Sequence, residues 1–308
     1  MTPCLLIAGP TAAGKTALAL SAAEQLDGEI INADSMQIYE GLRIITARPD
    51  AAEEARAPHH LFGTIDPATR FSVGDWLTAA LDRIEAIRAR GRTPILVGGT
   101  GLYFNALTKG LAPVPEIDPA VRARASGLLE TDGLEGVRAE ALLLDPVATV
   151  RVEPTDRQRL LRIVEVAWST GMRLSEHWAE TDPPLAAGAW CGIVLEPERE
   201  ALYARINQRF DLMLDGGAMA EVEAFAARQL DPELPAMKAL GVPPLIACLK
   251  GEMARDEAVE LAKRDSRRYA KRQMTWFRNQ HADWQRVTSL DKQEALRELE
   301  TILKGVKR

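Results

Sequence analysis

Short runs of apolar residues alternate along the chain with longer stretches in which apolar positions recur at helical spacing. The strand-like runs occupy residues 5–8, 29–33, 94–97 and 192–195. Near-continuous apolar runs of this length are typical of strands buried on both faces of a parallel sheet. Because helical patterns separate them, the chain is predicted to be an α/β protein whose parallel sheet is covered by helices.

The clearest helical pattern covers residues 73–90, where Trp76 and the later apolar residues share one face. Ser72 is suited to cap its start and Gly91 to end it. Further helices are expected over residues 17–23, 199–214, 219–228 and 256–277. Pro243 and Pro244 lie between the last two and are expected to break the chain there.

The region after Pro113 has a different character. Residues 115–188 contain no pattern of a central strand, and helical patterns dominate over residues 120–129, 134–144 and 156–169. We therefore predict a helical insertion domain over residues 114–189. It interrupts a core formed by residues 1–113 and 190–308.

Composition and charge narrow the class of protein. The chain has 308 residues and a net charge of −6, so any nucleic-acid partner must be held by local basic patches. Its three cysteines are far apart and read as buried thiols of a reducing compartment; His59 and His60 lack the spacing of a metal site. No apolar run approaches the ~20 residues of a membrane span. A cytoplasmic monomer without a membrane partner is expected.

One motif dominates the candidate chemistry. Residues 9–16 match the phosphate-binding pattern G-x-x-x-x-G-K-[ST] without a mismatch. Its two glycines let successive N–H groups turn toward an anion, its lysine adds a point charge, and its threonine hydroxyl suits Mg²⁺. The residues of this loop are Gly9, Pro10, Thr11, Ala12, Ala13, Gly14, Lys15 and Thr16. They predict a polyphosphate ligand with Mg²⁺.

Two further strand ends carry polar residues. Asp34 follows the second strand, where open α/β sheets bind ligands, and serves either as a Mg²⁺ ligand or as a general base. Thr100 follows the strand over residues 94–97, at the same edge. That strand leads into glycine rather than the acidic residue of a hydrolysing NTPase. The pattern therefore argues against a motor or switch ATPase.

Basic residues gather at three places. Arg264, Arg267, Arg268, Lys271 and Arg272 follow helical spacing and form one stripe, with Ala262, Tyr269, Ala270, Met274 and Phe277 on the other side. This concentration of charge in an acidic chain predicts a phosphate-binding surface. Trp276 and Phe277 suit base stacking, although at least one is expected in the core.

The other two places are less specific. Arg205 and Arg209 share a helix face and suit either a pyrophosphate or solvent. The insertion carries Arg122 and the basic run over residues 157–162, which suits RNA or a solvated helix face.

Taken together, these residues resemble the tRNA dimethylallyltransferase family, also called tRNA isopentenyltransferases. The matching stretches are residues 9–16, 34–39, 46–49, 58–61, 96–103, 156–160, 205–210 and 271–277. Residues 34–39 and 273–277 are the most selective among them. The chain departs from the family pattern at Ile45, where a glycine is usual, and at Val242–Pro244, where a basic residue is usual.

The resemblance implies a P-loop kinase-like core whose loop holds the diphosphate of dimethylallyl diphosphate with Mg²⁺. The prenyl group passes to N6 of the adenine 3′-adjacent to the anticodon of tRNA. Asp34 accepts the N6 proton, whereas Lys15 and Thr16, with its magnesium ion, act on the departing diphosphate. Arg209 and Arg205 add positive charge, and Thr100 contacts the diphosphate or the adenine.

The resemblance also implies a set of tRNA contacts. These are Asp34, Ser35, Met36, Gln37, Thr100, Arg122, Gln158, Arg159, Leu160, Leu161, Arg162, Lys238, Arg268 and Lys271. Three alternatives stay open: a P-loop small-molecule kinase, an adenylate isopentenyltransferase, and a non-catalytic RNA-binding protein. The kinase needs ATP, and the last two leave part of the pattern without a role.

Overall fold

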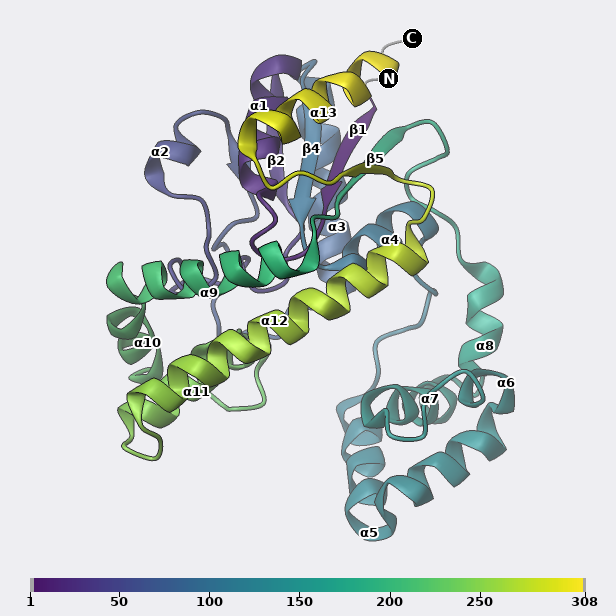
Figure 1. Ribbon diagram of the computed structural model, residues 1–308. Helices are drawn as coiled ribbons and strands as arrows, with labels where there is room; N and C mark the ends of the chain where they lie inside the picture. The colour runs from purple at the N-terminus through teal and green to yellow at the C-terminus, as the bar shows by residue number, and fades with distance from the viewer. Residues whose placement is uncertain (1–2, 307–308) are drawn as a thin grey trace. The chain divides into compact units, whose positions relative to one another are not determined.

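The computed structural model describes residues 3–306 and contains a six-stranded sheet in which every paired strand is parallel (Figure 1). The strand order is β3-β2-β4-β1-β5-β6. The strands are β1 Cys4–Ala8, β2 Gly28–Asn32, β3 His59–His60, β4 Thr93–Gly98, β5 Trp190–Leu195 and β6 Gln285–Val287. This confirms the predicted α/β fold.

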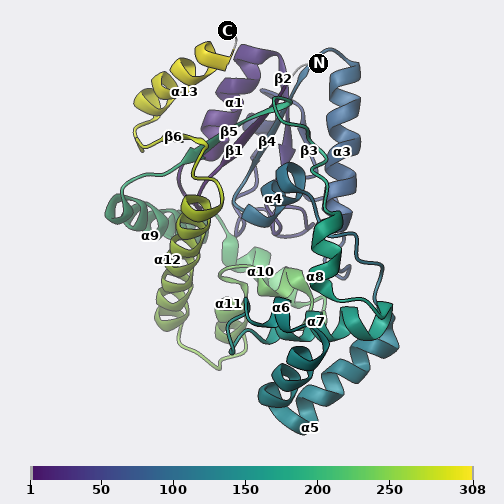
Figure 2. The same cartoon turned by 90° about the vertical axis from the view of Figure 1, so that its right-hand side faces the viewer.

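Helices cover both faces of the sheet. Alternate residues of β1 point to opposite faces and all of them are apolar, so each face needs a covering layer. Leu5 and Ile7 join a core with α1 Lys15–Leu26 and α13 Lys292–Val306. Leu6 and Ala8 join the other core, with α3 Val73–Ala89 and α4 Gly101–Lys109. Figure 2 shows α1 and α13 on one side of the strands and α3 on the other.

The sheet and the helices packed on it form one compact unit with several further helices. One of these, the single-turn helix α2 Ala51–Glu54, precedes β3, and the others follow β5. Those others are α9 Arg199–Asp215, α10 Ala218–Ala226, α11 Val242–Leu249 and α12 Arg255–Gln280, with a 3₁₀ turn over Pro235–Lys238. Arg267 and Lys263 of α12 bond to Asn207 and Asp211 of α9, so these two long helices are tied side by side.

Local signals set the ends of α3 as predicted. The Ser72 side chain accepts from the Asp75 N–H while the Asp75 carboxylate accepts from the Ser72 N–H, which forms a capping box. Gly91 follows the last turn with a φ of 75°, a conformation that favours glycine. The predicted helix over residues 73–90 is therefore confirmed.

The chain is interrupted between α10 and α12 as predicted, but Pro243 and Pro244 do not make the interruption. Both prolines lie in the first turn of α11, which begins after Gly241 with a φ of 87°. The first N–H groups of a helix have no partner within it, so proline removes nothing there. The short strands β3 and β6 and the helices α4 and α13 were not predicted either.

A second compact unit spans Thr108–Pro184 and contains helices only. They are α5 Pro119–Leu144, α6 Pro146–Thr149, α7 Arg157–Thr170, α8 Leu174–His177 and a 3₁₀ turn over Trp178–Glu180. Gly133, with φ 69° and ψ −172°, interrupts α5 between the two helices expected there. The expected boundaries were 114 and 189, but the Leu185 N–H donates to the Leu107 carbonyl, which ties both residues to the other unit.

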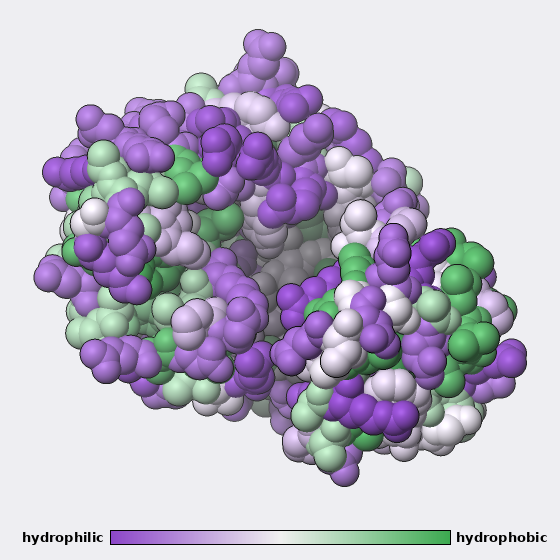
Figure 3. All heavy atoms as spheres, turned by 90° about the horizontal axis from the view of Figure 1, so that it is seen from below, coloured by the Kyte–Doolittle hydropathy of each residue, from purple (hydrophilic) through white to green (hydrophobic). Residues whose placement is uncertain are grey.

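The surface of this helical unit carries apolar side chains (Figure 3). Leu143 and Val150 are 80% and 74% exposed, whereas Val137 and Ile163 form its core. Among the described residues, no helix is both long enough and apolar enough to cross a membrane. Only Cys4 of the three free cysteines is fully buried; Cys191 and Cys248 are partly exposed, which corrects the expectation of three buried thiols.

Candidate active site

The loop between β1 and α1 forms an anion cradle whose shape depends on its glycines. Gly14 has a φ of 94° and caps α1, which begins at Lys15. A side chain on Gly9 would place its Cβ 3.0 Å from the carbonyl oxygen of Leu195. The glycines thus let the backbone turn tightly and approach β5, as the motif predicted.

A cavity of about 340 Å³ opens over this loop. The Arg209 guanidinium donates to the Thr11 hydroxyl at 3.3 Å. The Arg205 guanidinium lies 3.9 Å from the position of a Cβ on Gly14. Other lining residues are Lys15, Thr16, Asp34, Gln37, Thr46 and Arg48. The structure therefore brings the two arginines of α9 to the phosphate loop.

Two cations that line this cavity, Lys15 and Arg209, are partly buried and have no ion-pair partner among the described residues. Desolvation lowers the pKa of Lys15 to about 8, although the Asp34 carboxylate opposes this shift. Desolvation likewise lowers the pKa of Arg209 to about 10. Within residues 3–306, no carboxylate oxygen lies within ion-pair distance of either group. An anion bound here would supply the missing charge.

Asp34 is fixed by a residue that the sequence did not single out. Asn32, buried at the end of β2, accepts the Asp34 N–H at 2.8 Å and donates to the Asp34 carbonyl at 2.9 Å. The Trp76 indole in turn donates to the Asn32 carbonyl at 2.8 Å. One Asp34 carboxylate oxygen accepts the Met36 N–H at 2.9 Å. A polar residue at the end of a buried strand, directly after two isoleucines, was the available signal for Asn32.

A second cavity of about 260 Å³ adjoins the first. Both cavities are lined by Thr11, Ala12, Asp34, Thr46 and Arg209. The second also includes Met36, Phe210, Lys238, Tyr269 and Arg272. Asp34 therefore lines both the cavity over the phosphate loop and this more apolar one.

Thr100 lies at the predicted sheet edge but has local partners. Its hydroxyl accepts the Ser35 N–H at 2.9 Å and donates to the Ser35 hydroxyl at 3.3 Å. The Tyr269 phenol, whose pKa is raised by burial, also bonds to Thr100. Thr100 thus holds the turn after Asp34, and its contact with a substrate stays a prediction.

The basic stripe of α12 is narrower than predicted. Arg267 bonds to Asn207 and is used between helices, whereas Arg264, Arg268, Lys271 and Arg272 are exposed as predicted. The predicted apolar side is buried except at Tyr269, which lines the second cavity because it lies at the edge of that face. Phe277 packs in the core, as expected for one of the two aromatic residues.

The residues expected to contact tRNA from the helical unit lie on α5 and α7. Arg122, Gln158 and Arg159 are exposed, and Arg122 lies close enough to lower the pKa of Arg162 further after burial has lowered it. Leu160 is fully buried in the core of this unit, so its side chain cannot make the expected contact. Leu161 is half-buried.

The remaining predicted contacts already have partners within the protein. The Gln37 amide donates to the carbonyls of Thr46 and Ala47, which places it in the wall of the first cavity. Lys238 pairs with Glu233 at 2.9 Å and lines the second cavity. Both remain candidates for contact with tRNA.

The fold and the site define a group-transfer protein with a phosphate-binding loop and a carboxylate at one sheet edge. A family model described as IPP transferase matches residues 37–280, and the chain belongs to this family. A tRNA dimethylallyltransferase of Maricaulis maris (strain MCS10) is 69% identical over 303 residues, which cover 98% of each chain.

Two solved structures extend the comparison. The tRNA isopentenylpyrophosphate transferase of Bacillus halodurans gives a TM-score of 0.72 at 33% identity, covering 100% of this chain and 97% of that one. A eukaryotic dimethylallyltransferase, captured in crystallographic snapshots of its action on tRNA, gives a TM-score of 0.85 at 26% identity. It covers 98% of this chain and 78% of that one.

Proposed function

We propose that this protein transfers a dimethylallyl group from dimethylallyl diphosphate to N6 of the adenine 3′-adjacent to the anticodon in tRNA. The observation that carries the proposal is that Asp34 lines two adjoining cavities, one rich in cations and one more apolar. The relatives named tRNA dimethylallyltransferase support the reaction, since one is similar over nearly the whole chain.

The diphosphate of the donor fits the first cavity. The loop amides, Lys15 and Arg209 surround the place where negative charge grows as the allylic C–O bond breaks. Such preorganised positive groups stabilise a departing anion without first having to reorient. Arg205 extends the positive wall over Gly14.

Mg²⁺ fits the same cavity by the chemistry of its lining. The Thr16 hydroxyl and the Asp34 carboxylate both line it, and Mg²⁺ prefers few protein oxygens together with phosphate oxygens. Thr16 is the residue proposed to hold the ion, and bound Mg²⁺ would neutralise part of the diphosphate charge.

The adenine fits the second cavity, beside Tyr269 and Met36. Its N6 forms the new bond to C1 of the dimethylallyl group while the bond from C1 to the diphosphate oxygen breaks. The N6 proton passes to the Asp34 carboxylate, a base that the exocyclic amine needs because it is a weak nucleophile. The base must leave its stack to reach this position.

The tRNA backbone fits the exposed basic side chains. On α12, exposed Arg268, Lys271 and Arg272 line a shallow groove of about 460 Å³ together with Trp276. The helical unit presents Arg122 and Arg159 on its own surface. Each set suits phosphate contact, which makes binding depend on salt.

One assay tests the proposal. The purified protein is incubated with tRNA, Mg²⁺ and labelled dimethylallyl diphosphate, and label is measured in the RNA. We expect transfer to adenosine next to the anticodon and none to tRNA whose adenine is replaced by guanine. Rapid turnover of ATP without transfer would instead indicate a P-loop kinase.

A further inference from the structure

We infer that Gln273 of α12 is a positioning residue for the diphosphate site. Its side chain is 5% exposed and spans two loops from different strands. The Oε1 atom accepts the Thr11 N–H of the phosphate loop at 2.9 Å, and Nε2 donates to the Gly99 carbonyl at 2.8 Å. One amide thus ties the loop after β1 to the turn after β4.

The amide side chain of Gln273 satisfies both partners at once. The Thr11 N–H needs an acceptor and the Gly99 carbonyl needs a donor, so the orientation of the Gln273 amide is fixed by its contacts. A carboxylate would place an oxygen against the Gly99 carbonyl. An apolar side chain would leave both backbone groups without a partner.

The neighbouring glycine gives independent support. A Cβ on Gly99 would lie 2.2 Å from the Nε2 atom of Gln273, a distance that atoms do not adopt. No unusual φ requires glycine at this position. Glycine at position 99 therefore leaves the space that the Gln273 amide occupies.

The contact reaches the reacting groups through Thr11. The Thr11 N–H is held by Gln273, and the Thr11 hydroxyl accepts from the Arg209 guanidinium at 3.3 Å. Arg209 lines both cavities. Gln273 therefore sets the position of a cation that the proposed function assigns to the diphosphate, without itself lining the cavities described here.

The role of Gln273 rests on the proposed function, because it assumes that a diphosphate binds beside Thr11. The first test therefore measures the binding of inorganic diphosphate with Mg²⁺ by titration calorimetry. We expect Gln273→Leu to raise the Kd about tenfold, because two buried backbone groups lose their partner. The affinity for an anticodon stem-loop RNA should stay within about twofold, since the exposed cations of α12 are intact. Gln25→Leu, the same change at an exposed position of α1, should alter neither.

The second test is a double-mutant cycle, and its Gly99→Ala variant remains informative if the Gln273 variants fold poorly. Gly99→Ala should weaken diphosphate binding in the wild type by displacing the amide, and should have little further effect beside Gln273→Ala. Gln273→Glu keeps an acceptor for Thr11 and should fall between wild type and Gln273→Leu.

Specific outcomes overturn the inference. Unchanged diphosphate affinity in Gln273→Leu, additive effects in the cycle, or equal losses for diphosphate and RNA would each do so. A wild-type protein that fails to bind diphosphate at all would remove the proposed function together with this inference. Normal wild-type binding with an insensitive variant would remove the inference alone.

Discussion

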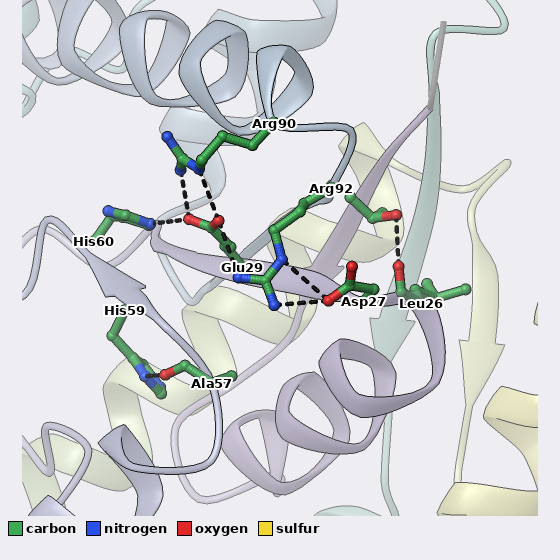
Figure 4. Close-up of polar contacts among 9 residues, drawn as sticks. Leu26, Asp27, Glu29, Ala57, His59, His60, Arg90 and Arg92 are labelled. Carbon is green, nitrogen blue, oxygen red and sulfur yellow. Dashed lines mark hydrogen bonds and ion pairs between the residues drawn. The ribbon is translucent and has the colours of Figure 1, made fainter.

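The two ends of β2 carry charged clusters of opposite design. At its amino end, the carboxylate of buried Glu29 accepts hydrogen bonds from the Arg90 guanidinium at 2.7 Å and the Arg92 guanidinium at 3.2 Å (Figure 4). The same carboxylate bonds to the His60 ring at 2.6 Å. Just beyond its carboxyl end, Asp34 shares a cavity with Lys15, which has no carboxylate within ion-pair distance among the described residues.

The pKa values follow this difference. Burial alone would raise the pKa of Glu29, but hydrogen bonds from Arg90 and His60 lower it to about 2. At the other end, burial lowers the pKa of Lys15 to about 8. A cluster that satisfies its own charges has none left for a ligand, whereas cations that lack a carboxylate partner suit an anion from outside.

The largest expected effect comes from removing the base. Asp34→Asn should lower prenyl transfer by about 100-fold or more, because the N6 proton then has no acceptor. The asparagine keeps the size of the side chain, so binding of tRNA should persist in a filter assay. Turnover equal to wild type would remove Asp34 from the mechanism.

Removing one arginine from each end tests the comparison directly. Arg209→Met should weaken binding of diphosphate about 20-fold, because a charge-assisted contact is lost. Arg90→Met removes the same charge at the amino end and should leave this Kd unchanged while lowering the melting temperature. Similar losses of affinity in both variants would break the distinction between the two ends.

The basic surface of α12 extends the comparison from diphosphate to tRNA, a much larger anion. Arg268→Glu with Lys271→Glu should weaken tRNA binding about tenfold or more and reduce the slope of log K against log salt by about two. The affinity for diphosphate is the control and should not change. Equal loss of both ligands would mean that this helix face is structural.

The Lys15 pKa predicts how donor binding changes with pH. Lys15 carries its charge below about pH 8 and loses it above, so the affinity for diphosphate should fall about tenfold from pH 7 to pH 9. Lys15→Arg keeps its charge and serves as the control, since the titration of the ligand is common to both. A profile that is the same in both proteins contradicts the assignment.

The smallest effect belongs to the paired cluster. Glu29→Gln should lower the free energy of unfolding at pH 7 by about 2 kcal/mol and leave transfer unchanged. Because the folded pKa lies below the ordinary value, the carboxylate contributes fully above about pH 4.5 and less as pH falls toward 2. The difference in the free energy of unfolding between Glu29→Gln and wild type, measured in urea, should therefore shrink as the pH falls from about 4.5 toward 2.

The exposed neighbour Asp27 provides the matched control for that cluster. It pairs with Arg92 but its side chain is 76% exposed, so Asp27→Asn should change stability by less than about 0.5 kcal/mol. A cost equal to that of Glu29→Gln would mean that burial does not set the strength of these pairs.

Patterns that act over a few residues were readable in the sequence. The run before Gly9, the phosphate loop and the N-cap at Ser72 each depend on neighbours in the chain. The family resemblance supplied the reaction and the role of Asp34. The position of Asp34 at the shared sheet edge followed from the parallel strand pattern alone.

Contacts between distant segments were not readable in the same way. Gln273 meets Thr11 across 262 residues, and no spacing rule links them. Glu221 of α10 accepts the successive N–H groups of Arg43, Ile44 and Ile45, and so holds the loop that contains Thr46. The two-residue strand β3 has too few positions to show any periodicity.

The strand order has one more consequence, for where the two groups of the site can lie. β4 lies between β1 and β2, and the register places Ile7, Val97 and Asn32 in one row. Neighbouring strands are ~4.8 Å apart, so the axes of β1 and β2 are separated by about 10 Å. The phosphate loop and Asp34 therefore leave the sheet on either side of β4. The cavity that both line has Val97 and Gly98, the last residues of this middle strand, in its wall.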